Sequence, residues 1–103
     1  MKQVIEGKVY DTAKAELLHY YSDGMPGDLE AVTESLYRTQ NGAYFIAGEG
    51  GPATDYASQT GQREWTGGAG IHPLLRTEAI EWLEHCGASD VLLAEFEDEL
   101  EQA

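Results

Sequence analysis

The chain has 103 residues, with 19 Asp and Glu against six Lys and Arg, and its formal net charge is -13 at pH 7. Hydrophobic residues (42%) and aromatic residues (10%) are numerous enough to fill one modest core, which excludes wholesale disorder and predicts a single domain over residues 1–103. The charge argues against direct binding to nucleic acid or to an anionic membrane, because both are also negative. A basic partner protein suits such a surface.

We expect neither a membrane span nor a leader sequence. No apolar run approaches the roughly 20 residues that cross a bilayer, and residues 1–6 do not resemble a signal peptide. The single cysteine, Cys86, cannot form a disulfide within the chain. These observations predict a cytoplasmic protein in a reducing compartment.

The first part of the chain predicts a strand followed by a helix. Alternation over Val4–Tyr10 favours a strand. Asp11 or Thr12 can cap a helix that runs to about Tyr21, and the Gly and Pro residues within 23–28 end it. The buried stripe of this helix is expected at Leu17, Leu18 and Tyr21.

The middle of the chain predicts a hairpin and further short strands. Two strand-like runs, Ala31–Gln40 and Ala43–Ala47, are joined by Asn41-Gly42, which favours the two positive φ angles of a type I′ turn. One helical turn is expected over Ala53–Ser58. Two short strands are expected around Gly67-Gly68, over Gln62–Thr66 and Gly70–His72.

Two amphipathic helices are predicted in the last quarter of the chain. Thr77 caps the first and Gly87 ends it, and its apolar face consists of Ala79, Trp82, Leu83 and Cys86. Ser89 caps the second, with an apolar stripe of Leu92, Leu93, Phe96 and Leu100. The class is therefore α+β: a small antiparallel sheet of about three to four strands, including the Asn-Gly hairpin, with about three helices packed on it.

Six short patterns lie together over most of residues 7–84. They are Tyr10-Asp11-Thr12-x-x-Ala15, Leu36-Tyr37-Arg38-Thr39-x-x-Gly42-x-Tyr44-Phe45, Gly48-x-Gly50-Gly51-Pro52, Tyr56-Ala57, Gly67-Gly68-x-x-Ile71-x-Pro73-Leu74 and Ala79-x-x-Trp82-Leu83. This combination resembles a family of small, largely uncharacterised bacterial proteins carried by phages and other mobile elements. The resemblance implies a bacterial host cell and a mobile-element setting. In composition and setting, the chain is also similar to anti-restriction and anti-CRISPR inhibitors.

A glycine pattern in the middle of the chain has the letters of a dinucleotide-binding fingerprint. Gly48-x-Gly50-x-x-Ala53 follows a predicted strand, but the fingerprint requires a parallel βαβ unit. Pro52 interrupts the pattern, and Glu49 would face a phosphate. We therefore expect a turn whose glycines take positive φ and let the backbone pass close to a neighbouring segment.

Cys86 and the adjacent His85 are not expected to form a catalytic pair. Consecutive residues on a helix point in different directions, and the negative end of the helix dipole disfavours a thiolate. We expect Cys86 to be a buried small side chain and His85 to be solvated. The three histidines lack metal-ligand spacing, so neither a metal nor another cofactor is predicted.

The acidic residues of the last quarter carry the functional prediction. No Lys or Arg follows Arg76, although like charges four residues apart destabilise a helix. Carboxylates three or four residues apart have Cβ atoms about 5–6 Å apart, a spacing comparable to that of successive phosphates. The predicted partner-binding residues are Glu78, Glu81, Glu84, Asp90, Glu95, Asp98, Glu99 and Glu101.

These residues suggest a non-enzymatic inhibitor that binds the nucleic-acid-binding surface of a host defence complex and presents carboxylates where phosphates would lie. Anti-CRISPR activity is its most specific form, followed by anti-restriction activity. A regulatory or toxin-neutralising module with a basic partner is the alternative. A third is an enzyme with a pocket around Gly48–Pro52, in which Arg38 or Arg63 would hold an anionic substrate. The tyrosine-rich sheet is a second place for an interface. Charge reversal at Glu95, Asp98 and Glu99 is expected to preserve the fold, because these residues lie off the apolar stripe.

Overall fold

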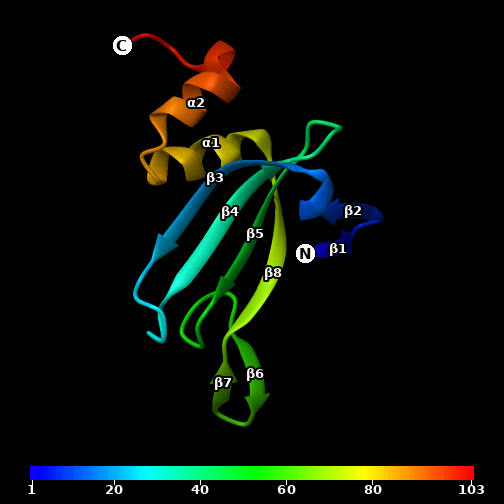
Figure 1. The fold of residues 1–103 in the computed structure, drawn as a ribbon, viewed down its shortest axis with the longest axis vertical. Helices are drawn as coiled ribbons and strands as arrows, with labels where there is room; N and C mark the ends of the chain where they lie inside the picture. The colour runs from blue at the N-terminus through cyan, green and yellow to red at the C-terminus, as the bar shows by residue number, and fades with distance from the viewer.

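Four antiparallel strands form the central sheet of the computed structural model, which describes residues 1–103 (Figure 1). In spatial order, the strands are β3 (Glu16–Asp23), β4 (Val32–Arg38), β5 (Tyr44–Gly50) and β8 (Gly68–Leu74). The helical elements are α1 (Arg76–His85), α2 (Ser89–Phe96) and the 3₁₀ turn η2 (Glu97–Glu99). The predicted α+β class is confirmed, but the structure has two α-helices where three were expected.

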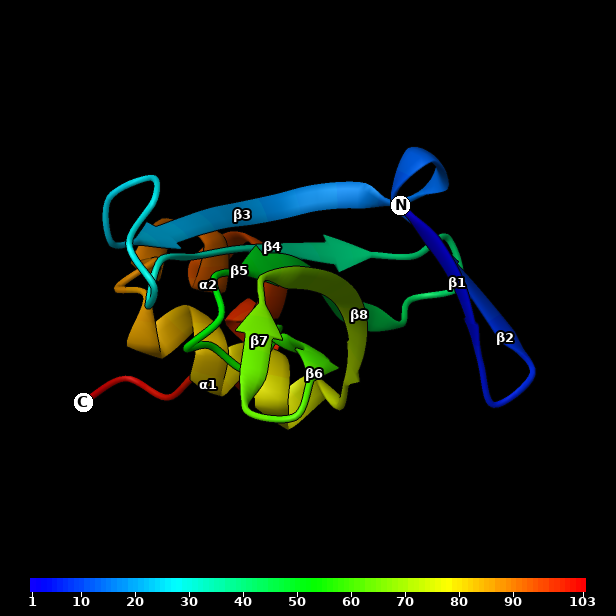
Figure 2. The same cartoon turned by 90° about the horizontal axis from the view of Figure 1, so that it is seen from below.

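Two short hairpins extend from this sheet. They consist of β1 (Lys2–Ile5) with β2 (Lys8–Asp11), and of β6 (Ser58–Gly61) with β7 (Glu64–Thr66). The helices lie together on one side of the sheet, and the β1–β2 hairpin stands apart from them (Figure 2). The prediction of one strand over Val4–Tyr10 is wrong, because Glu6 and Gly7 both have positive φ, 50° and 79°, and reverse the chain.

The predicted helix over residues 12–21 is also wrong. Asp11 does act as a cap, since its carboxylate accepts the amide hydrogen two residues later, but the turn is only η1 (Thr12–Lys14). The rest of the segment is the edge strand β3. A bulge between Leu17 and His19 breaks the alternation of this strand, so its apolar residues are spaced like those of a helix. Leu17, expected to be buried, is 53% exposed.

The hairpin at Asn41-Gly42 is present, with a different turn from the one predicted. The Thr39 amide donates to the Ala43 carbonyl oxygen at 2.8 Å and closes a three-residue loop. Within this loop only Gly42 has positive φ, +84°. The geometry is therefore that of a type I turn followed by a left-handed glycine, rather than a type I′ turn.

The segment between β5 and β8 differs in detail from the prediction. The helical turn expected over Ala53–Ser58 is absent, and the chain makes separate tight turns closed by Thr54 and Ala57 amides. The short strands expected over Gln62–Thr66 and Gly70–His72 are present in part, as β7 and the middle of β8. The partner strand β6 was not predicted.

The main core lies between the sheet and the helices. Its buried side chains are Leu36, Tyr44, Ile46, Ala79, Leu83, Ala88, Leu92 and Phe96. A smaller cluster on the other face of the sheet consists of Tyr10, Phe45 and Ile71. Its Tyr10 and Phe45 rings meet edge to face, with centroids 5.5 Å apart, and so attach the β1–β2 hairpin to the sheet.

The helix ends are one or two residues from their predicted positions. α1 starts at Arg76, and the carboxylate of Glu78 accepts the Leu75 amide hydrogen at 2.7 Å, so Thr77 is not its cap. Likewise, α2 starts at Ser89, and this residue is not its cap. Gly87 has φ of +69°, as predicted for a residue that ends a helix.

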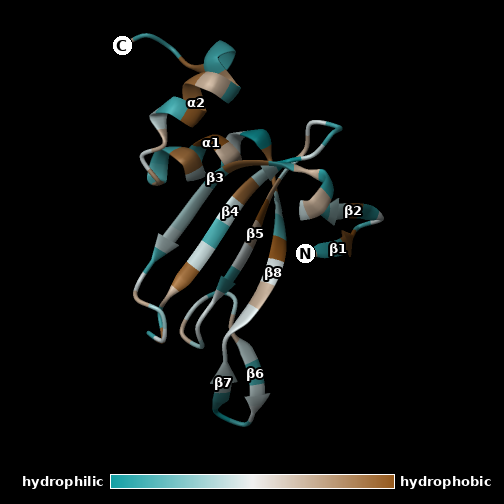
Figure 3. Ribbon diagram, viewed as in Figure 1, coloured by the Kyte–Doolittle hydropathy of each residue, from teal (hydrophilic) through white to brown (hydrophobic).

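The apolar stripes of the two helices are mostly where they were predicted. Ala79 and Leu83 of α1 and Leu92 and Phe96 of α2 are buried, whereas Leu93 is 54% exposed. Figure 3 shows apolar and hydrophilic segments alternating along both helices. Neither helix is long and apolar enough to cross a membrane.

Candidate partner-binding surface

The structure divides the eight predicted partner-binding carboxylates into two groups. Those of the first group form hydrogen bonds or ion pairs within the chain: Glu78, Glu95 and Glu99. Those of the second group, which we call the free carboxylates, are exposed and have no such contact: Glu81, Glu84, Asp90, Asp98 and Glu101. The free carboxylates belong to α1, α2 and the segment that follows, at one end of the molecule (Figure 1).

Glu95 is the centre of a polar network between α2 and the sheet. Its carboxylate accepts hydrogen bonds from Arg38 Nη1, at 2.5 Å to Oε1 and 2.6 Å to Oε2, and from the Tyr44 hydroxyl at 2.8 Å. The Glu95 side chain is only 13% exposed. Its hydrogen bond raises the pKa of Arg38, and burial together with this carboxylate raises the pKa of Tyr44. The charge of Glu95 is therefore neutralised within the fold.

Arg76, at the start of α1, holds Glu99. Its Nε donates to Glu99 Oε1, and its Cζ atom lies over the Phe96 ring, 4.9 Å from the centroid. The hydrogen bond to Glu99 raises the pKa of the Arg76 guanidinium. This pair joins the two helices across the end of the core and neutralises a second predicted site residue.

These two ion pairs contradict one expectation from the sequence. Charge reversal at Glu95, Asp98 and Glu99 was expected to preserve the fold, but a lysine in place of Glu95 would face Arg38 and one in place of Glu99 would face Arg76. Position on a helix away from the apolar stripe does not make a carboxylate free. Of the three, only Asp98 is exposed and without a partner.

A second polar network joins β4 to α1 and to the segment before β6. Glu34 is half-buried, and its carboxylate accepts hydrogen bonds from the Tyr56 hydroxyl at 2.5 Å and from Trp82 Nε1 at 3.2 Å. The Tyr56 hydroxyl lies directly over Gly48. The sequence patterns did not indicate this network, because its members come from distant segments and share no local motif.

Removing the Tyr56 hydroxyl is expected to weaken the fold and to change its response to alkali. Burial, followed by the hydrogen bond to Glu34, raises the pKa of Tyr56 above its ordinary value of 10.0. A folded-state pKa above the unfolded one gives stability that is complete below about pH 10 and is lost as the pH rises further. We expect Tyr56→Phe to lower the free energy of unfolding by about 1 kcal/mol at neutral pH and to flatten its decline above pH 10. Urea denaturation at several pH values measures both effects, and an unchanged alkaline slope would contradict them.

Cys86 lies at the end of α1 and is half-buried. Burial, followed by the Glu34 charge, raises the pKa of its thiol. A thiol with a raised pKa is a poor nucleophile at neutral pH. The structure therefore agrees with a packing role for Cys86, beside an exposed His85.

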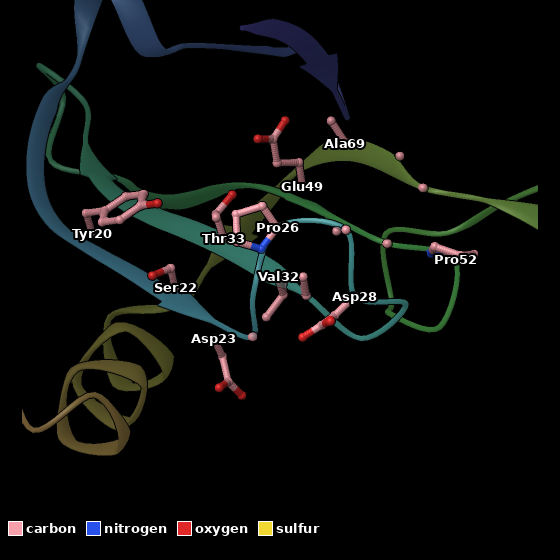
Figure 4. Close-up of a pocket in the computed structure, with 17 residues that line it drawn as sticks. Tyr20, Ser22, Asp23, Pro26, Asp28, Val32, Thr33, Glu49, Pro52 and Ala69 are labelled. Atoms are coloured by element: carbon pink, nitrogen blue, oxygen red, sulfur yellow. The ribbon is translucent and has the colours of Figure 1, made fainter.

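A hollow of about 770 Å³ lies at the end of the sheet beside the β3–β4 loop (Figure 4). Its charged lining consists of Asp23, Asp28 and Glu49, without any Lys or Arg. The enzyme hypothesis placed an anionic substrate here, held by Arg38 or Arg63, but neither arginine lines this hollow. Its charge suits a cation better than an anion.

The glycines around Gly48–Pro52 do not form a nucleotide site. Gly48 and Gly50 lie inside β5 of an antiparallel sheet, whereas the dinucleotide fingerprint needs a parallel unit. The expected close approach is confirmed, because a Cβ on Gly51 would come 2.6 Å from the Leu29 carbonyl oxygen. The expected positive φ is absent from these three glycines.

No family model, curated protein or solved structure matches this chain. Within the structure, no three His, Cys, Asp or Glu side chains are grouped so as to hold a metal ion. A function is therefore inferred from the charges and surfaces of the molecule itself.

Proposed function

We propose that the protein is a non-enzymatic acidic inhibitor that binds the nucleic-acid-binding surface of a host defence complex. The free carboxylates of the helical end would occupy the positions of phosphates. In a phage or mobile-element setting, inhibition of a CRISPR complex is the most specific form of this activity. The observation that carries the proposal is the set of exposed carboxylates without an internal cation at this end of a chain whose net charge is -13.

The basic residues of the chain do not compensate these carboxylates. No Lys or Arg follows Arg76 in the sequence. The two arginines that contact the helical end, Arg38 and Arg76, are already engaged by internal carboxylates. The field at this end therefore stays negative and would attract the Lys and Arg side chains of a protein that normally binds phosphates.

The surface proposed here is smaller than the one predicted from the sequence. Glu95 and Glu99 are ion-paired with Arg38 and Arg76, so the predicted set loses these two carboxylates. Glu81 and Glu84 remain three residues apart on the exposed side of α1. Charges in this arrangement raise the association rate of the two proteins more than they raise the affinity of the complex. The association rate falls steeply with salt.

Reversing four free carboxylates is expected to weaken binding strongly at moderate salt. The variant is Glu81→Lys with Glu84→Lys, Asp90→Lys and Asp98→Lys, all at exposed positions without internal partners. We expect at least a tenfold weaker association with a basic, nucleic-acid-binding partner, because like charges now face each other across the interface. Surface plasmon resonance over a series of salt concentrations measures this loss.

A matched control carries the same change in net charge elsewhere on the molecule. It combines four exposed acids from loops and hairpins: Glu6→Lys, Glu30→Lys, Asp55→Lys and Glu64→Lys. We expect this control to retain most of the wild-type affinity. Equal losses in the two variants would show that only net charge matters and would contradict a defined contact surface at the helical end.

A further inference from the structure

The two edges of the central sheet differ in how their outward backbone groups are satisfied. Backbone hydrogen bonds join Thr39 to Ala43 and Gly51 to Ala31, at the two ends of the β4–β5 pair. Because bonded pairs alternate along antiparallel strands, the backbone groups of odd-numbered residues in β4 and β5 bond between these two strands. The backbone groups of even-numbered residues in β5 therefore bond to β8. The backbone N–H and C=O groups of the odd-numbered residues of β8 therefore point away from the sheet, at its outer edge. Of these, Ile71 donates its amide hydrogen to Gln3 Oε1 at 3.3 Å, and position 73 is a proline without an amide hydrogen.

The edge formed by β3 has no comparable protection. The register of β3 with β4 directs the backbone N–H and C=O groups of Tyr20 and Ser22 away from the sheet. No hydrogen bond within the chain uses these outward groups. No strand lies beyond β3 in the sheet (Figure 1). Proteins usually block such an edge with a proline, a lysine or a covering segment, since it can pair with another strand.

The side chains along this edge distinguish its two faces. On the face away from the helices, Leu17 and Tyr20 are 53% and 56% exposed. On the other face, the rings of His19 and Tyr21 lie against Trp82, with centroids 5.8 Å and 6.4 Å away. Asp23 ends the strand, and its charge raises the pKa of Tyr21.

We propose that the outer edge of β3 binds an extended segment of the basic partner as an additional strand. This inference rests on the proposed function for the charge of the partner, and it adds a second contact surface. The added strand would alternate apolar side chains, beside Leu17 and Tyr20, with Lys or Arg side chains on the face that borders Asp23 and α1. A second copy of the chain suits this edge less well, since it would add another net charge of -13.

The probe is a blocked peptide of about eight residues that alternates lysine with valine. Titration of the isotope-labelled full chain, followed by amide hydrogen exchange, reports which backbone groups become protected. We expect slowed exchange at Tyr20 and Ser22, whose amide hydrogens are unpaired in the free protein. A peptide with N-methylated valines keeps the charge but cannot form the ladder, and we expect it to bind at least tenfold more weakly.

A proline at Ser22 tests the same edge from the side of the protein. Ser22→Pro removes one outward amide hydrogen from an edge strand, where proline is tolerated. We expect at least tenfold weaker binding of the lysine–valine peptide, whereas the control Ser22→Ala retains wild-type affinity within about twofold. The exchange measurement on the unmodified protein does not depend on the folding of this variant.

Each outcome separates this inference from the proposed function. If Tyr20 and Ser22 stay unprotected, or Ser22→Pro binds like wild type, the edge is not a docking site. If the peptide binds without needing the β3 edge, and its binding is lost when the free carboxylates are reversed, the helical surface is supported and the strand inference is wrong. Peptide binding that needs the β3 edge but is unaffected by the same reversal would support the strand as a contact surface separate from the helical one, and the helical surface is then tested by the binding of the whole basic partner to the two charge-reversal variants. Dimerisation through β3, seen by sedimentation, would assign the edge to a second copy and overturn the proposal.

Discussion

Replacing Glu95 by alanine is expected to lower the free energy of unfolding by about 2–3 kcal/mol. The substitution leaves the Arg38 guanidinium, whose side chain is only 35% exposed, without its main partner. It also removes the acceptor of the Tyr44 hydroxyl, which is buried beside Phe96. Breaking one partner of such a pair destabilises more than the pair itself contributes, because the partly buried Arg38 guanidinium keeps only its ion pair with the exposed Glu16. Urea denaturation monitored by circular dichroism measures the change.

The matched control for Glu95→Ala is Asp98→Ala. Asp98 lies two residues beyond the end of α2. Asp98 is exposed and has no hydrogen bond or ion pair. We expect its removal to change stability by less than about 0.5 kcal/mol. If Glu95→Ala changed the free energy of unfolding as little as Asp98→Ala, Glu95 would be free to bind a partner. The division of the eight carboxylates into two groups would then be wrong.

Replacing Gly48 by alanine is expected to destabilise the protein by about 1–3 kcal/mol. An ideal Cβ at this position would lie 2.2 Å from the Tyr56 hydroxyl oxygen and 2.3 Å from its Cζ atom. The ring cannot move away without losing its 2.5 Å hydrogen bond to Glu34 and its packing on His72. The clash therefore disrupts a network that joins the sheet to α1.

Gly70 provides a control for this effect in the neighbouring strand. It pairs with Gly48 across β5 and β8, but a Cβ added there meets no atom within 4 Å. We expect Gly70→Ala to be neutral or slightly stabilising, since alanine has less freedom in the unfolded chain. Thermal denaturation of the two variants side by side gives the comparison. Equal effects would show that the Tyr56 contact does not constrain position 48.

The parts of the fold that follow from local patterns were predictable. Asn41-Gly42 marked its hairpin because few sequences favour a reversal so strongly, although the turn type depended on the register of the flanking strands. The helical spacing of Ala79 and Leu83 identified α1 because only its core face is apolar. Both features are encoded within a few residues of where they occur.

The errors come from places where distant segments decide the structure. The bulge after Leu17 gives β3 the apolar spacing of a helix, and only its pairing with β4 selects the strand. Glu95 and Glu99 have no sequence neighbour that indicates their arginine partners, which lie 57 and 23 residues away in the chain. The excess of acid was therefore predictable, but the selection of free carboxylates within it required the three-dimensional arrangement.

The most direct test of the proposed function is competition with DNA. The full chain would be immobilised, incubated with bacterial lysate at low salt, and then washed with excess duplex DNA. We expect a basic nuclease, restriction or CRISPR subunit to be captured, to be released by DNA, and not to be captured by the variant with reversed Glu81, Glu84, Asp90 and Asp98. A captured partner that DNA does not displace, or that still binds this variant, would contradict phosphate mimicry and favour a regulatory module with a different interface.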